Sequence, residues 1–127
     1  MPVLSAPILT SFAADILAAA GVPAARAAMA AESLIASNLR GVDSHGLQLL
    51  PYYIEQILAG EMDPKSDGRV ISESGSCLVF DAQNALGQWV ADTCCGHAVR
   101  LAAAHGAGVV VARERTISAP RPGGRRK

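Results

Sequence analysis

The sequence of 127 residues is poor in aromatic side chains, which make up 4% of it, and in cysteine, of which it has three. With so few aromatics, alanine, valine and leucine must fill the core. Adjacent Cys94 and Cys95 cannot easily bridge each other, and no second pair at ligand spacing supports a metal site. We therefore expect no disulfide, no metal and a reducing compartment. We expect Cys77, Cys94 and Cys95 to act as small hydrophobic core residues.

Long apolar runs are absent too. No segment approaches the roughly 18 consecutive apolar residues of a membrane span. The N-terminus has neither the basic start nor the extended apolar stretch of a signal peptide. These absences lead us to expect a cytoplasmic protein without a membrane segment, and the length suits one small domain.

The formal net charge of zero conceals an uneven distribution. Residues 1–112 hold five basic and ten acidic side chains, a net charge of −5, whereas residues 113–127 hold six basic side chains and one acidic, a net charge of +5. The second segment also contains two prolines and two glycines, and no helix or strand period follows Ile117. This composition predicts a disordered basic tail.

Two helices are predicted at the N-terminus. Apolar residues at helical spacing indicate a first helix that Ser5 caps and Gly21 ends. Pro23 then opens an alanine-rich helix that reaches about Leu39. Because alanine lets a neighbouring helix approach closely, we expect the two to form a hairpin.

A third helix and two strands are expected next. Apolar residues from Leu50 to Leu58 predict a short helix with Pro51 in its first turn. A polar loop over residues 61–68 leads to short strands at Val70–Glu73 and Cys77–Asp81, joined by a turn.

The last predicted elements are a helix over Gly87–His105 and a buried strand over Gly108–Ala112. A strand–helix–strand succession predicts a right-handed crossover onto a sheet. The chain is thereby divided into an N-terminal helical segment (1–62), a partial α/β sheet domain (69–112) and the tail (113–127). A core strand that leads into no further sheet makes the domain look unfinished.

The most informative stretch is Asn38–Gly46. It brings a guanidinium (Arg40), a carboxylate (Asp43), a hydroxyl (Ser44) and an imidazole (His45) into six residues. Glycine, aspartate and serine are poor helix formers, so the stretch predicts a sharp connection between helices that presents Arg40 and His45 together. An imidazole exchanges a proton near neutral pH, and an arginine can bind a carboxylate through two hydrogen bonds. The pairing suits an enzyme that binds an acid and moves a proton beside it.

This stretch, followed by Leu50–Tyr53 and Gly60, resembles the N-terminal region of the malate/L-lactate dehydrogenase family. That family comprises NAD(P)-dependent enzymes without the common Rossmann fold, among them ureidoglycolate, sulfolactate and diketogulonate oxidoreductases. Residues 81–88 and 105–109 follow the same pattern, so the resemblance covers residues 5 to about 113. It implies an α/β (α+β) fold: an N-terminal helical hairpin and a short helix, then the start of a mixed sheet with one crossover helix, incomplete relative to the family.

The resemblance also implies roles for the motif. In the family, the histidine that matches His45 donates a proton to the substrate carbonyl, which makes His45 the candidate catalytic residue. Arg40 would hold a substrate carboxylate, while Ser44 and Asp43 would fix the imidazole tautomer and the turn. A structural ion pair of Arg40 with Asp43, or with a helix C-terminus, is the alternative.

The same resemblance implies NAD or NADP as cofactor, a small 2-hydroxy or 2-oxo acid as substrate, and a possible homodimer. The cofactor-binding residues would lie mostly beyond the end of this chain.

The pattern breaks after Arg113, where relatives continue with Asn-His-Phe-Gly, whose histidine also belongs to the active site. The peptide Arg115–Pro120 can be encoded so that a shifted frame reads Asn-His-Phe-Gly-Ala. We therefore expect a truncated or frameshifted dehydrogenase without full activity.

Two other functions are compatible with the sequence. One is a non-enzymatic module whose basic tail binds nucleic acid, although the acidic body and the absence of aromatics after Trp89 disfavour it. The other is an interaction protein that pairs with a longer relative through its N-terminal helices.

Overall fold

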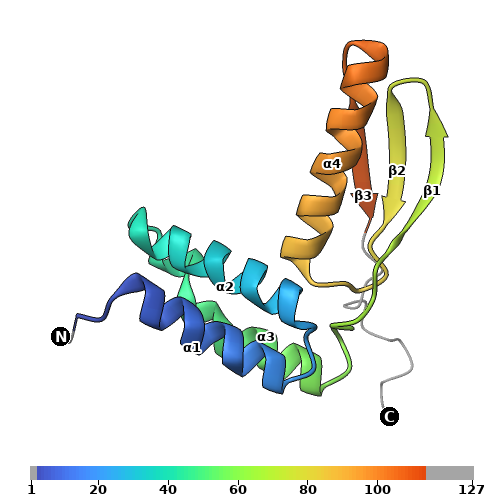
Figure 1. The fold of residues 1–127 in the computed structure, drawn as a ribbon. Coiled ribbons are helices and arrows are strands. Elements are labelled where there is room, and N and C mark those ends of the chain that lie inside the picture. The colour runs from blue at the N-terminus through green and yellow to red at the C-terminus, as the bar shows by residue number, and fades with distance from the viewer. Residues whose placement is uncertain (1–2, 114–127) are drawn as a thin grey trace. The chain divides into compact units, whose positions relative to one another are not determined.

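The structure is a computed structural model that describes residues 3–113. The predicted tail begins at residue 113, which is wrong for Arg113, because that residue is the last of strand β3 (Val109–Arg113) and pairs with Asp81; residues 114–127 lie outside the described residues. The chain divides into two compact units, with the boundary between Gly60 and Glu61. The elements are α1 (Ala6–Ala19), α2 (Ala24–Leu39), the 3₁₀ turns η1 (Asp43–His45) and η2 (Leu47–Leu49), α3 (Leu50–Leu58), β1 (Arg69–Ser74), β2 (Cys77–Asp81), α4 (Gly87–His105) and β3 (Val109–Arg113) (Figure 1).

The ends of the first two helices agree with the sequence prediction. The Ser5 hydroxyl accepts a hydrogen bond from the backbone N–H of Ile8, at 3.4 Å, and so caps α1. Gly21 follows α1 with φ of 108°, a left-handed conformation that glycine adopts without strain. Pro23 precedes the first turn of α2.

The predicted hairpin is confirmed: α1 and α2 lie side by side in the first unit (Figure 1). Three of the seven buried residues of α2 are alanine, and the buried residues of the two helices recur every three or four positions, as helical geometry requires. They include Ala13 and Leu17 of α1, and Ala27, Ala30, Ala31 and Leu34 of α2.

The expected mixed sheet is found in the second unit, where it has three strands in the order β1-β2-β3. Strand β2 pairs antiparallel with β1 and parallel with β3, and α4 forms the connection between the parallel strands. The core of this unit lies between α4 and the sheet, where Leu78, Phe80 and Leu101 are fully buried and Val110 packs against them.

The prediction of a buried final strand is wrong. Val109 and Val111 are 53% and 56% exposed, and every residue of β1 is exposed as well. Successive side chains of a strand point to opposite faces, so only Val110 of this run turns toward α4. Among residues 61–113, no further element covers the other face of β3, where the apolar side chains of Val109 and Val111 are exposed.

The expectation that all three cysteines are core residues is also wrong. All three are free thiols, but Cys77 and Cys95 are exposed and only Cys94 packs against the core. Neighbouring helical residues are about 100° apart on the helix, so Cys94 and Cys95 cannot both face the sheet. Burial, with a smaller effect of Cys95, raises the pKa of Cys94.

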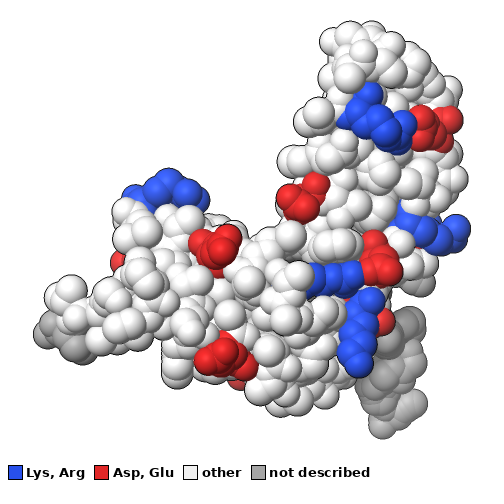
Figure 2. Space-filling model, viewed as in Figure 1, with Lys and Arg blue, Asp and Glu red and all other residues white. Residues whose placement is uncertain are grey.

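Charged side chains of both signs are interspersed on the face of the molecule shown in Figure 2 rather than gathered into a basic patch. Within residues 3–113, no helix has the length and apolar character needed to cross a bilayer.

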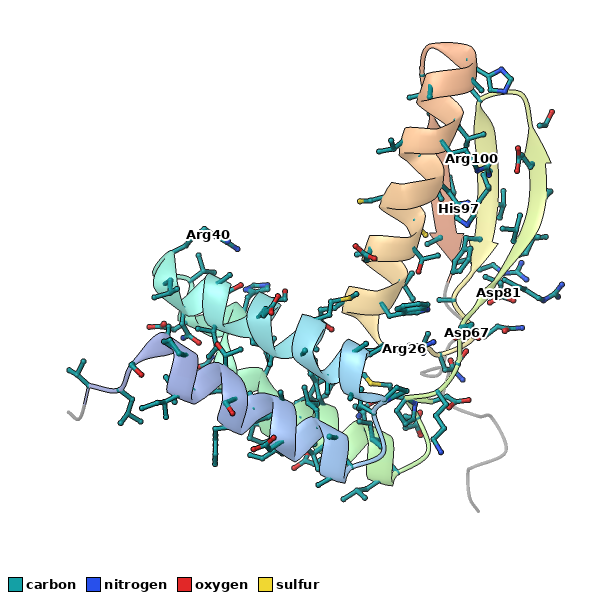
Figure 3. All side chains as sticks on the ribbon, viewed as in Figure 1. Arg26, Arg40, Asp67, Asp81, His97 and Arg100 are labelled. Atoms are coloured by element: carbon teal, nitrogen blue, oxygen red, sulfur yellow. The ribbon has the colours of Figure 1, made fainter. Side chains whose placement is uncertain are left out.

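One surface ion pair links α4 to β1, the edge strand on the other side of β2 from β3. Arg100 donates to both carboxylate oxygens of Glu73, at 3.1 and 3.0 Å, on the side of α4 that faces the strands (Figure 3). The hydrogen bonds from Arg100 are the main cause that lowers the pKa of Glu73 below its ordinary value of 4.5. Both side chains are about half exposed, so solvent screening keeps the contribution to stability small.

We expect Arg100→Leu to reduce thermal stability slightly at neutral pH and not at all in acid. A carboxyl with a lowered folded-state pKa stabilises the fold above its unfolded pKa, and that contribution is lost as pH falls through the folded-state value. Melting curves of wild type and variant should therefore converge below pH 4.5, the ordinary pKa of this carboxyl. Arg69→Leu removes an exposed charge from the same sheet and serves as control. A difference in melting temperature that does not change with pH would contradict the assignment.

Candidate active site

The predicted site residues lie at the C-terminal end of α2. Arg40 is the C-cap residue of that helix, and the next residue, Gly41, has φ of 82°. Glycine accepts this left-handed conformation without strain, which turns the chain sharply out of the helix. The Gly41 N–H donates to the Asn38 carbonyl at 2.9 Å and closes the turn.

The predicted connection between helices is confirmed as two consecutive 3₁₀ turns. The His45 N–H donates to the Val42 carbonyl at 3.1 Å, and the Gly46 N–H donates to the Asp43 carbonyl at 3.0 Å. Asp43, Ser44 and His45 are all exposed. The connection thus carries a carboxylate, a hydroxyl and an imidazole in a defined backbone conformation at the surface.

The structure brings Ser44 and His45 together. The Ser44 hydroxyl lies 3.0 Å from Nδ1 of His45, and which of the two donates depends on the imidazole tautomer. This contact occupies one ring nitrogen and leaves Nε2 as the nitrogen that an incoming ligand can reach. An imidazole held in this way can give a proton to a neighbouring oxygen or take one from it.

Arg40 is separate from this pair. Its side chain lies at the exposed end of α2 (Figure 3) and, among the described residues, makes no hydrogen bond or ion pair with Asp43, Ser44 or His45. The Asp43 carboxylate instead accepts a hydrogen bond from the side chain of Asn38, at 2.8 Å. The ion pair of Arg40 with Asp43, which the sequence allowed as an alternative role for this arginine, is not formed. The guanidinium can therefore still bind a carboxylate.

Sequence reasoning assigned no role to Asn38, although the motif begins with it. Its side-chain Nδ2 donates to Asp43, and its Oδ1 accepts from the backbone N–H of Leu47 at 2.8 Å. The residue type alone could have indicated this role, because a side-chain amide has both a donor and an acceptor and can bridge a carboxylate and an N–H group.

A surface groove of the first unit does not coincide with this turn. It lies between α1 and α2, has a volume of about 530 Å³ and is largely apolar. Leu39 borders it, but Asp43, Ser44 and His45 do not. Among residues 3–113, no three histidine, cysteine, aspartate or glutamate side chains are grouped so that they could bind a metal.

Comparison with known proteins places this geometry in a family. A family described as malate/L-lactate dehydrogenase matches residues 4–118. A malate dehydrogenase from Pyrococcus horikoshii is 37% identical over 105 residues, which cover 83% of this chain and 29% of that protein. An L-sulfolactate dehydrogenase from Methanocaldococcus jannaschii is 34% identical over 99 residues, which cover 78% of this chain and 29% of that protein.

Solved structures agree with the sequence match. The structure of the malate dehydrogenase from P. horikoshii superposes with a TM-score of 0.84 at 34% identity, over 90% of this chain and 33% of that one. The sulfolactate dehydrogenase from M. jannaschii gives a TM-score of 0.85 at 30% identity, over 91% and 34%. The chain thus spans about 29% of the length of these curated relatives. The matched residues include the whole turn from Asn38 to Gly46, and the chain belongs to the malate/L-lactate dehydrogenase family.

Proposed function

We propose that this chain supplies the proton donor and the carboxylate-binding side chain of an NAD(P)-dependent dehydrogenase that interconverts small 2-hydroxy and 2-oxo acids. The observation that carries the proposal is the contact between Ser44 and His45, which holds Nδ1 and leaves Nε2 accessible. Relatives named malate, L-sulfolactate and L-lactate dehydrogenase support the substrate class.

The chemistry of these residues fits such a reaction. When a carbonyl is reduced, its oxygen needs a proton, and a cationic imidazole at His45 supplies one. In the opposite direction, the neutral imidazole takes the proton of the hydroxyl group. Arg40 holds the neighbouring carboxylate by paired hydrogen bonds, and Ser44 keeps the ring in one orientation.

A nicotinamide cofactor would supply or accept the hydride, and the described residues do not by themselves fit it. The groove between α1 and α2 is lined by no basic side chain that could bind a pyrophosphate, and it does not reach Asp43, Ser44 or His45. We infer that other residues of the whole protein bind the cofactor and set the choice between NAD and NADP.

The proposal is tested by grafting residues 4–113 in place of the matching segment of the P. horikoshii malate dehydrogenase. Oxidation of NADH and NADPH is then followed with pyruvate, oxaloacetate and other 2-oxo acids. Turnover by the chimera supports the proposal, and a chimera that folds but reduces none of these acids contradicts it. If the chimera does not fold, titration of the 127-residue chain with the same acids decides, because binding at the turn must shift the NMR signals of the His45 ring.

The coding DNA tests the prediction about residues 114–127. We expect it to contain Asn-His-Phe-Gly in another reading frame within codons 115–120, followed by a long open continuation. Sequencing several hundred bases downstream and translating all three frames gives the answer. Stop codons soon after codon 113 in every frame would contradict a frameshift.

No observation on residues 3–113 favours the two non-enzymatic functions. The comparisons give no support to a nucleic-acid-binding module, and the basic tail on which it depends lies outside the described residues. A homodimer and a cytoplasmic location stay predictions.

A further inference from the structure

We propose that Asn38 is the positioning residue for His45: its side-chain amide clamps both ends of the turn that carries the imidazole. The consequence for turnover rests on the function proposed above. The clamp itself rests only on the geometry of the first unit.

The two hydrogen bonds of Asn38 bracket the imidazole in the chain. Nδ2 donates to the Asp43 carboxylate, two residues before His45, and Oδ1 accepts from the Leu47 N–H, two residues after it, both at 2.8 Å. One rigid amide plane therefore fixes the separation of the two ends of the turn and ties both to the last turn of α2. Aspartate at position 38 would repel Asp43, and alanine would leave both partners unsatisfied.

Gly46 provides a second, independent sign that the amide is tightly enclosed. This residue is buried, and a Cβ added to it would fall on the amide atoms of Asn38. Its φ of −103° is open to any residue, so space and not backbone conformation requires glycine here. The amide thus packs directly against the backbone that follows His45.

The clamp also determines where charge is available. Asp43 is held by a neutral amide, and Arg40 has no part in that bond. The carboxylate therefore does not neutralise the guanidinium that would bind the acid group of a substrate. The amide of Asn38 therefore orients the turn that carries His45 and also leaves the Arg40 guanidinium without an ion-pair partner among residues 3–113.

The test measures the ring nitrogen signals of His45 by ¹⁵N NMR in the full 127-residue chain. At alkaline pH, where an imidazole is neutral, a ring held by Ser44 in one tautomer gives two widely separated ring-nitrogen shifts, whereas an unrestrained ring averages the two tautomers and narrows that separation. We expect Asn38→Ala and Gly46→Ala to reduce this separation. Gln48→Ala is the matched control, because it removes an exposed amide from the next turn and should leave the His45 signals unchanged.

Rescue separates positioning from a general loss of stability. Asn38→Asp alone should disturb the His45 signals, whereas Asn38→Asp combined with Asp43→Asn should restore them. In the double variant, the carboxylate at position 38 accepts from the Leu47 N–H and from the new amide at position 43. If Asn38→Ala unfolds the chain, this double variant decides: recovery of unequal ring shifts supports the clamp, and no recovery overturns it.

Unchanged His45 signals in a folded Asn38→Ala variant would also overturn the inference. Failure of the proposed function is distinguishable from this outcome. The His45 ring signals could respond to Asn38→Ala while the chimera keeps its turnover after His45 is removed. That combination would support the clamp and refute the catalytic role of His45.

Discussion

Replacing His45 by alanine is expected to lower kcat for 2-oxo acid reduction about 10²–10⁴-fold in the chimera, the usual size of a general-acid contribution. The carbonyl oxygen then has no positioned proton donor. KM should change far less, because Arg40 still binds the carboxylate. Steady-state kinetics with pyruvate and oxaloacetate would measure both constants.

Two controls make this result specific. His105→Ala removes an exposed imidazole at the end of α4 and should leave kcat unchanged. Added imidazole should restore part of the activity of the His45→Ala variant, because a free base can enter the space left by the ring. A kcat within a few-fold of the unmodified chimera would contradict the proposed role of His45.

Alanine at Gly108 is expected to cost about 1–3 kcal/mol of unfolding free energy or more, as overpacking of a fitted core does. Gly108 lies where the chain returns from α4 to β3. A Cβ there would overlap the carbonyl oxygen of Ala98 and lie 3.0 Å from Cβ of Leu101 and 3.1 Å from the backbone nitrogen of Ala102. Two of these three atoms belong to the helix backbone, so α4 must move away from the sheet to make room.

The same substitution at Gly96 should have the opposite sign. Gly96 lies inside α4, and a Cβ added to it would meet no atom within 4 Å. Glycine in a helix interior is roughly 0.5–1 kcal/mol less favourable than alanine, so Gly96→Ala should stabilise the chain by about that amount. Urea denaturation followed by circular dichroism compares the two variants. Equal stabilities would contradict the close approach of α4 and β3.

Local signals predicted most of the element boundaries. The range of α4 was predicted as found, because apolar spacing marked its length and Gly106, with φ of 88°, ended it. The run Val109–Val111 shows the limit of such signals. Three successive valines favour a strand, but whether a strand is covered depends on elements elsewhere in the chain.

The turn shows a second limit. From the sequence, an ion pair of Arg40 with Asp43 or with a helix C-terminus is the alternative to the binding of a substrate carboxylate. In the structure, Asn38 binds Asp43 instead, because α2 ends there and the chain turns back toward the amide. The bond from Leu47 to Asn38 depends on the same reversal, which residue types alone do not specify.

Every hydrogen bond that shapes the turn joins residues no more than nine positions apart, the longest being that from Leu47 to Asn38. Closing so short a loop costs little chain entropy, and contacts of low sequence separation form early in folding. The motif should therefore acquire its geometry as soon as α2 has formed, before the strands of the second unit pair. Damage to those strands would then reduce the amount of folded protein without altering the geometry around His45.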